Sequence, residues 1–152
     1  MKIELTVNGG REIFDVAPDE MLLDTLRSHG FKSVRRGCDT TSCGVCTVLV
    51  DGLLVPSCSY LSVRAEGKHV TTVEGIPEEA SKLSEHFGDE GADQCGFCNA
   101  GIALSVHALK NRTTSPDEDT IKDALTGHLC RCTGYVSQLK AIKAYLKEGD
   151  NE

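Results

Sequence analysis

Eight cysteines, arranged in two groups of four, constrain this chain more than any other feature. In the first group three cysteines have the spacing C-x4-C-x2-C, and a fourth follows after eleven residues. In the second group a C-x2-C pair is separated by thirty-one residues from a C-x-C pair. Neither of these pairs completes a four-ligand site alone, so the chain between them must fold back. The first quartet is Cys38, Cys43, Cys46 and Cys58, and the second quartet is Cys95, Cys98, Cys130 and Cys132.

The spacing of the first quartet indicates that these four cysteines bind an iron–sulfur cluster. C-x4-C-x2-C is the ligand run of plant-type [2Fe–2S] clusters. Zinc is the main alternative because it also binds four thiolates, but structural zinc sites usually pair two C-x2–4-C knuckles. For the second quartet, spacing alone leaves iron–sulfur and zinc closer. A thioredoxin-like redox pair at Cys95 and Cys98 would need a βαβ setting and would leave Cys130 and Cys132 without a role.

Each quartet occupies one half of the chain, which predicts two domains, residues 1–76 and residues 77–152. Each half has about 75 residues, a size at which a hydrophobic core alone gives marginal stability. Tryptophan is absent and aromatic residues make up only 5% of the chain, which also indicates small cores. The metal sites are therefore expected to contribute folding free energy as well as redox chemistry.

The acidic composition limits the partners. The formal net charge is −7 with neutral thiols, and two oxidised [2Fe–2S] units, each −2 with four thiolates, lower it to about −11. Nucleic acid and anionic membranes are poor partners at this charge, so a soluble protein partner is favoured. No signal peptide and no apolar run of ~18 residues is evident. We expect a cytoplasmic location, where thiols stay reduced and disulfides are disfavoured.

The first half predicts short strands with one helix. Alternating apolar and polar residues, with Asn-Gly and Asp-Gly turns, are typical of β-hairpins. The pattern alone gives an α+β fold. The expected elements are a hairpin over residues 2–16, a helix that opens at Pro18-Asp19 and stops at Gly30, a second hairpin over 47–55, and a strand over 70–73.

The second half predicts three or four helices that share one metal centre. An acidic segment over residues 74–93 is expected to contain a linker and a solvated helix. Asn99 is expected to be the N-cap of the next helix. Ser115-Pro116-Asp117-Glu118 resembles a capping box with proline at the first helical position. A last helix from Gly134 onward carries an apolar stripe of Val136, Leu139, Ile142 and Leu146.

Other residue types indicate no second chemistry. The five histidines do not have Rieske spacing, and eight cysteines already complete two sites, so we expect surface or packing roles for them. Lys32, Arg35 and Arg36 are expected to be ordinary surface cations. Arg131 either raises a cluster potential or offsets local negative charge. No nucleotide-binding glycine motif or nucleophile–base pair is evident, which predicts a chain that moves electrons between sites held elsewhere.

Three motifs together resemble the small iron–sulfur subunit of the molybdenum hydroxylases, the family of xanthine dehydrogenase and aldehyde oxidoreductase. They are Gly37-Cys38 through Cys46, Gln94-Cys-Gly-Phe-Cys98 and Leu129-Cys-Arg-Cys-Thr-Gly-Tyr135. The resemblance covers nearly the whole chain. It implies an N-terminal β-grasp plant-type ferredoxin-like domain followed by an all-α four-helix domain, each with one [2Fe–2S] cluster.

The resemblance also implies the partners. A large subunit would oxidise the substrate at molybdenum, with water supplying the oxygen. Electrons would then pass from molybdopterin through both clusters to FAD on a medium subunit. The second quartet is implied to hold the cluster nearer the molybdopterin, and the first quartet the cluster nearer the flavin. Gln94 and Cys132 match family positions that approach the pterin, offering a side-chain amide and a ligand sulfur.

The chain departs from the family pattern after Cys98, where Asn99-Ala100 replaces the usual Thr-Pro. Asparagine can replace threonine as N-cap, whereas alanine lacks the fixed φ of proline. The helix start is expected to survive this change. Two other functions compete with the family assignment: a free-standing two-cluster ferredoxin-like electron carrier, and a zinc-stapled interaction protein.

Overall fold

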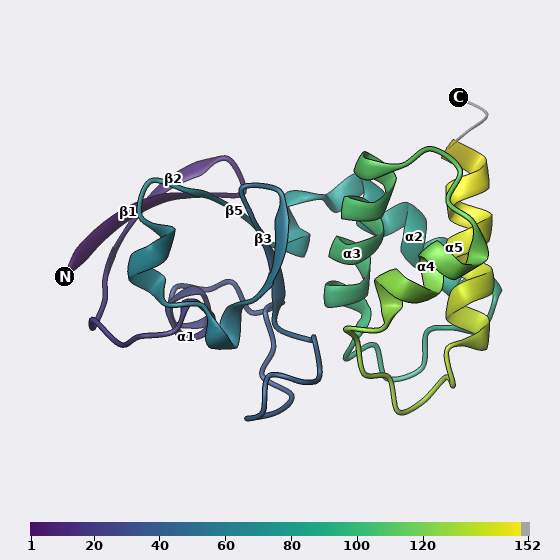
Figure 1. The fold of residues 1–152 in the computed structure, drawn as a ribbon, viewed down its shortest axis with the longest axis horizontal. Coiled ribbons are helices and arrows are strands. Elements are labelled where there is room, and N and C mark those ends of the chain that lie inside the picture. Colours follow the sequence, from purple (N-terminus) through teal and green to yellow (C-terminus); the bar gives the residue numbers. More distant parts are fainter. Residues whose placement is uncertain (150–152) are drawn as a thin grey trace.

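The computed structural model describes residues 1–149, in which a sheet-containing part and a helical part lie side by side (Figure 1). The strands are β1 (Lys2–Val7), β2 (Gly10–Asp15), β3 (Thr47–Val50), β4 (Leu53–Pro56) and β5 (His69–Thr71). The helices are α1 (Leu22–Ser28), α2 (Pro77–Asp89), α3 (Asn99–Arg112), α4 (Glu118–Leu125) and α5 (Val136–Gly149). Short 3-10 helices span Ser57–Ser59, Ser62–Ala65 and Val73–Gly75. The predicted α+β class is confirmed.

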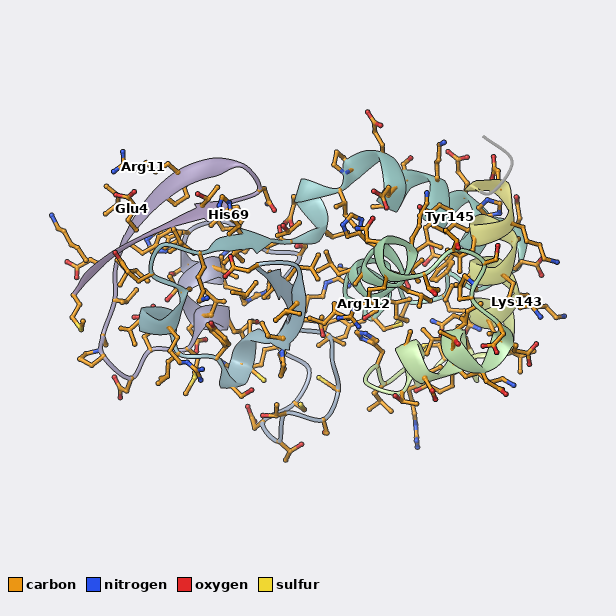
Figure 2. All side chains as sticks on the ribbon, turned by 45° about the horizontal axis from the view of Figure 1, so that its top comes forward. Glu4, Arg11, His69, Arg112, Lys143 and Tyr145 are labelled. Carbon is orange, nitrogen blue, oxygen red and sulfur yellow. The ribbon has the colours of Figure 1, made fainter. Side chains whose placement is uncertain are left out.

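The five strands form one mixed sheet in the order β2-β1-β5-β3-β4. β1 pairs antiparallel with β2 and parallel with β5, whereas β3 pairs antiparallel with β4 and β5. Both predicted hairpins are confirmed. Their turns, Asn8-Gly9 and Asp51-Gly52, have positive φ at both residues, as a two-residue type I′ turn requires. An ion pair between Glu4 and Arg11 crosses the β1–β2 hairpin on its outer surface (Figure 2).

Each part has its own hydrophobic core, and a third cluster joins them. The sheet core includes Leu5 and Phe14 and is closed by the leucines of α1. The helical core is built from all four helices α2–α5, and Tyr145 lies inside it whereas Lys143 of the same helix points outward (Figure 2). The joining cluster links β3 to α3 and consists of Leu49, Ile76, Leu104 and Ala108. The two parts are therefore packed against each other through α3.

Two predicted elements of the sheet part have different bounds in the structure. The first helix begins at Leu22 and not at Pro18-Asp19, because Met21 is extended and forms an isolated bridge with Leu61. Its stop at Gly30, which has a φ of +100°, is confirmed. The last strand ends at Thr71, because the chain turns into a 3-10 helix at Val73.

Three details of the helical part were predicted wrongly. The N-cap of α3 is Cys98, and Asn99, its first residue, uses its side-chain amide to donate to Asp93 at 3.0 Å. The N-cap of α4 is Asp117 and not Ser115, since the Asp117 carboxylate accepts the N–H of Thr120 at 2.9 Å. Val136 is 64% exposed, although the rest of its predicted stripe is buried or half-buried. The first turn of α5 therefore leaves an apolar side chain at the surface.

Candidate metal centres

The first quartet lies on the loop between α1 and β3 and on the 3-10 helix that follows β4. Cys38, Cys43 and Cys46 belong to the loop, and Cys58 belongs to the helix. Ser57 ties the helix to the loop, because its N–H and its hydroxyl both donate to the Cys46 carbonyl, at 3.3 and 2.6 Å. The thiols of Cys38 and Cys43 interact, as do those of Cys46 and Cys58. The structure thus brings the four predicted residues together.

Backbone donors and burial act in opposite directions on the first quartet. Backbone N–H groups of Ser42 and Thr40 point at the Cys38 sulfur and lower the pKa of this thiol to about 6. Burial raises the pKa of the Cys46 thiol to about 11. The loop therefore offers N–H donors to a thiolate and at the same time excludes water, which suits a sulfur that binds a metal.

The second quartet is assembled from two loops. Cys95 precedes α3 and Cys98 caps it, while Cys130 and Cys132 lie in the loop between α4 and α5. The sulfurs of Cys95 and Cys132 are 3.5 Å apart, and the thiols of Cys98 and Cys130 are close enough to influence each other's charge state. Cys98 and Cys130 are buried, whereas Cys95 and Cys132 are exposed. The fold-back that the sequence requires is therefore present.

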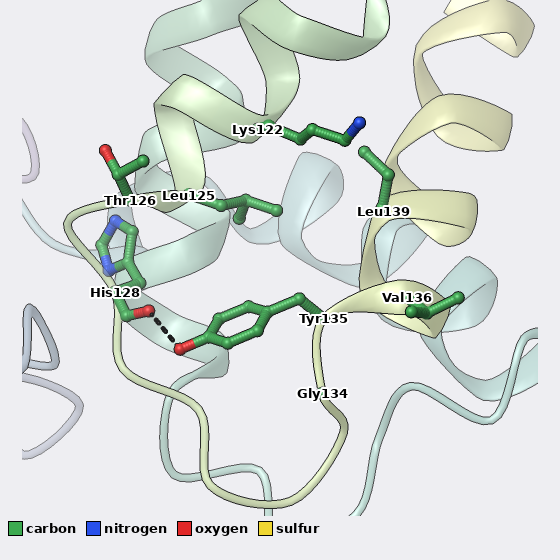
Figure 3. A pocket seen from close by; sticks show the side chains of 8 residues that line it. All are labelled: Lys122, Leu125, Thr126, His128, Gly134, Tyr135, Val136 and Leu139. Carbon is green, nitrogen blue, oxygen red and sulfur yellow. Dashed lines mark hydrogen bonds between the residues drawn. The ribbon is translucent and has the colours of Figure 1, made fainter.

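Tyr135 holds the loop that carries Cys130. Its hydroxyl accepts the Cys130 N–H at 2.8 Å and donates to the carbonyl oxygen of His128 at 3.0 Å, across the cleft between α4 and α5 (Figure 3). Thr133 completes the loop, because its hydroxyl oxygen lies 3.1 Å from the Cys130 sulfur and accepts the Tyr135 N–H at 3.1 Å. Tyr135 has a φ of +69°. These contacts fix the direction of the Cys130 side chain.

Sequence reasoning missed two polar side chains that support the second quartet. Gln138 of α5 is buried and its amide Nε2 donates to the Cys98 sulfur at 3.5 Å. Arg35 is not the ordinary surface cation that was expected: its guanidinium donates to the carbonyl oxygens of Gly96 and Phe97, at 2.7 and 3.0 Å. Gln138 could have been noticed as a polar residue on the buried side of α5, but no local pattern connects Arg35 with a loop sixty residues away.

The two quartets meet through the backbone. The N–H of Leu129 donates to the carbonyl oxygen of Cys43 at 2.9 Å. His128 packs into the same junction, where it is 5% exposed and its Nε2 lies 2.5 Å from the Ser105 hydroxyl. This histidine has the packing role that was expected of it. Because Leu129 is bonded to Cys130, a single hydrogen bond connects a residue of the first quartet to one of the second.

The donor set and the space around it fit [2Fe–2S] clusters. Each quartet supplies four free thiols, and a Cβ atom at Gly37 would crowd the Cys43 sulfur at 3.2 Å. Within residues 1–149, no three Cys, His, Asp or Glu side chains are grouped as ligands of one metal ion. A [2Fe–2S] cluster distributes its four thiolates over two irons, so its ligands need not converge on one point.

Comparison with known proteins identifies the family. A 2Fe-2S iron-sulfur cluster binding domain matches residues 5–72, and a [2Fe-2S] binding domain matches residues 72–143. The chain is 41% identical to the xanthine dehydrogenase iron-sulfur-binding subunit of Escherichia coli O157:H7, over 88% of this chain and 86% of that protein. This chain is a member of the family of small iron–sulfur subunits of the molybdenum hydroxylases. It therefore has two [2Fe–2S]-binding domains and an electron-transfer role.

Other members of this family show the same architecture in different assemblies. The nicotine 6-hydroxylase small subunit of Paenarthrobacter nicotinovorans is 39% identical, over 93% of this chain and 87% of that protein. The structure of quinoline 2-oxidoreductase from Pseudomonas putida 86 matches with a TM-score of 0.90 at 36% identity, over 99% of this chain and 96% of that one. Aldehyde oxidoreductase from Desulfovibrio desulfuricans ATCC 27774 has a TM-score of 0.92 at 35% identity, with 99% of this chain matching only 17% of that one. Iron–sulfur subunits of this family thus work with larger partners.

The remaining predicted site residue lies at the surface. Gln94 is exposed beside Cys95, as is Arg131 beside Cys132. Phe97 and Leu129 are 43% and 57% exposed and lie in the same two loops.

None of the helices in the described part of this iron–sulfur subunit is long and apolar enough to cross a membrane.

Proposed function

We propose that this chain transfers electrons from molybdopterin on a large partner subunit to FAD on a medium partner subunit. Residues 1–76 bind the cluster nearer the flavin, and residues 77–152 bind the cluster nearer the molybdopterin. The first cluster has the ligands Cys38, Cys43, Cys46 and Cys58, and the second has Cys95, Cys98, Cys130 and Cys132. A [2Fe–2S] cluster supplies one-electron storage, and the residues of this chain hold, insulate and connect the two clusters.

The hydrogen bond between Leu129 and Cys43 carries this proposal. It joins the two quartets by the route Cys43 carbonyl, Leu129 N–H and Cys130, which consists of covalent bonds and one contact of 2.9 Å. His128, the residue before Leu129, is buried beside this hydrogen bond. Such a connection favours rapid transfer of one electron from the second cluster to the first. A protein that needed two independent structural metals would not require it.

The exposed face around Cys95 and Cys132 supports docking of the large subunit there. These are the two exposed ligands of the second quartet, and Phe97 and Leu129 leave an apolar rim beside them. Exposed apolar side chains that surround a functional group are typical of a protein interface. Gln94, in the same loop, has an exposed side chain that can reach a neighbouring pterin. Gln94 and the Cys132 sulfur are thus the proposed contacts to the pterin.

The chemistry is divided between chains. The large subunit removes two electrons from its substrate, and water supplies the oxygen atom that enters the product. This chain accepts the electrons one at a time and passes each to the flavin. We also propose that it acts in the cytoplasm, because eight free thiols need a reducing compartment to remain available as ligands.

Purification of the untagged chain from its native source tests this function. We expect a complex with larger chains that contains molybdenum, flavin and about four irons per copy of this chain, and two distinct EPR signals after reduction. Cys46→Ser and Cys98→Ser should each change one of the two signals, which assigns them to the quartets. A monomer with two clusters but without molybdenum and flavin would establish a free-standing carrier instead. About two zinc ions and no iron would establish a zinc-stapled protein.

A further inference from the structure

Gln138 is a polar side chain at a core position. It is fully buried, and it lies on the face of α5 that also buries Ala141, Ile142 and Tyr145. These positions repeat at the spacing of one helix face, so an apolar residue is expected at 138. A buried side-chain amide is unfavourable unless its donor and its acceptor both find partners. The presence of glutamine therefore requires a reason other than packing.

The amide of Gln138 has a partner on one side only. Its Nε2 donates to the Cys98 sulfur at 3.5 Å, whereas its Oε1 has no hydrogen-bond partner within residues 1–149. A methionine would fill the same space without a buried, unpaired oxygen. What glutamine adds at this position is the N–H donor, and this donor points at a proposed cluster ligand.

The Cys98 sulfur depends on the Gln138 amide more than the Cys130 sulfur depends on any one of its donors. The Cys130 sulfur interacts with the hydroxyl and the backbone N–H of Thr133 and with the backbone N–H of Cys132. No other side-chain amide of residues 1–149 donates to the Cys98 sulfur, which lies at the buried end of the quartet. Removal of the Gln138 donor therefore changes the surroundings of one ligand and leaves the other three as they are.

We propose that Gln138 is a positioning residue that acts through Cys98 and raises the reduction potential of the second cluster. The inference rests on the ligand set proposed above. One-electron reduction adds negative charge that is shared by the ligand sulfurs, and an N–H dipole directed at a sulfur stabilises the reduced state more than the oxidised state. The low polarity of the buried site strengthens this effect. Gln138 thus favours the arrival of an electron on the cluster nearer the molybdopterin.

The test is an EPR-monitored redox titration of the full chain with its clusters, comparing the natural protein with Gln138→Met. At a fixed solution potential, the oxidised-to-reduced ratio of the second cluster should rise about threefold to tenfold in the variant, and tenfold corresponds to about 59 mV for one electron. The first cluster should not change. The melting temperature should not fall, because the variant removes an unpaired oxygen. The matched control is Ile142→Met, which alters an equally buried position one turn further along α5.

An unchanged second potential in a correctly loaded Gln138→Met protein would overturn the inference, whatever its melting temperature. If this variant does not load its clusters, a second measurement decides. The chain has two glutamines, so glutamine labelled with 15N at the side-chain amide, in a Gln94→Met background, marks Gln138 alone. We expect a 15N coupling to the reduced second cluster in pulsed EPR, and no coupling would overturn the inference. If the natural protein showed neither EPR signal after reduction, the proposed function itself would be refuted.

Discussion

Gly101, in the first turn of α3, lies directly against the carbonyl oxygen of Gly44 in the first cysteine loop: a Cβ atom at 101 would be 2.7 Å from that oxygen. Gly44 has a φ of +71°, and a Cβ atom there would lie 2.0 Å from the carbonyl oxygen of Gly127. Two glycines therefore let the first cysteine loop approach the helical part closely enough for Cys43 and Leu129 to form their hydrogen bond.

Replacement of Gly101 by alanine should weaken this junction. Because the nearest atom is a backbone carbonyl that cannot rotate away, we expect the free energy of unfolding to fall by about 1–3 kcal/mol in urea titrations. Electron transfer between the clusters should also become slower, as measured by flash reduction. The matched control is Gly88→Ala in α2, where a Cβ atom would meet nothing within 4 Å. That variant should be more stable by about 0.5–1 kcal/mol, as alanine usually is within a helix. Equal effects at both positions would contradict the tight junction.

Tyr135→Phe should destabilise the loop that carries Cys130. The change removes one oxygen atom and leaves the Cys130 N–H and the His128 carbonyl without their partner. We expect a loss of about 1–3 kcal/mol in the free energy of unfolding, and faster release of the second cluster to a chelator. Tyr60→Phe is the control, because the Tyr60 hydroxyl makes an exposed contact of 3.3 Å with the Arg64 carbonyl. If the two variants released the second cluster at the same rate, Tyr135 would not secure the loop.

The sequence was sufficient for the elements whose signals are local. Asn8-Gly9 and Asp51-Gly52 specify tight turns, and the spacing of the cysteines predicted which of them meet. Helix starts were less predictable, because several residues near each start can cap it and long-range contacts select one. The N-cap of α4 is Asp117 and not Ser115, because the Asp117 carboxylate binds the Thr120 N–H. Helix α1 begins later than predicted, because Met21 forms a bridge with Leu61.

The contacts that surround the ligands could not be predicted in the same way. Gln138 and Arg35 reach cysteine loops that lie forty to sixty residues away in sequence, and only the packing of the helices decides that they arrive there. The exposure of Val136 has a similar origin, since α5 begins beyond the edge of the helical core. Periodicity identifies which face of a helix is apolar, but not how far along the helix that face is covered.

Arg35 should be a specific bridge between the two cysteine loops. It donates to the carbonyl oxygens of Gly96 and Phe97, and its guanidinium lies 5.3 Å from the centre of the Phe97 ring. Lysine keeps the charge but cannot reproduce a planar group that donates twice and stacks. We expect Arg35→Lys to lower the free energy of unfolding by about 1–2 kcal/mol, measured by urea titration. Arg36→Lys, at a neighbouring exposed cation that pairs with Asp24, should leave it nearly unchanged. A larger effect at Arg36 would show that surface charge, and not the bridge, matters.

Glu118 should remain ionised in mild acid. Hydrogen bonds from Lys122 and then Lys143 lower the pKa of its carboxyl group to about 2, against an ordinary value of 4.5. Because the folded-state pKa is the lower one, the stabilisation that these contacts provide is fully present above pH 4.5 and is lost as the pH falls towards 2. The 13C shift of the Glu118 carboxylate should therefore stay constant from pH 7 down to about 4.5.

Lys143→Met should raise the pKa of Glu118, because it removes the contact of 2.8 Å that joins α4 to α5. The 13C titration should then begin at a higher pH than in the natural chain. Lys140→Met changes an exposed lysine on the same helix and should leave the titration as it is. Identical titrations in the natural chain and in Lys143→Met would mean that Lys122 alone holds the carboxylate, and that the ion pair between the two helices contributes nothing to the charge state of Glu118.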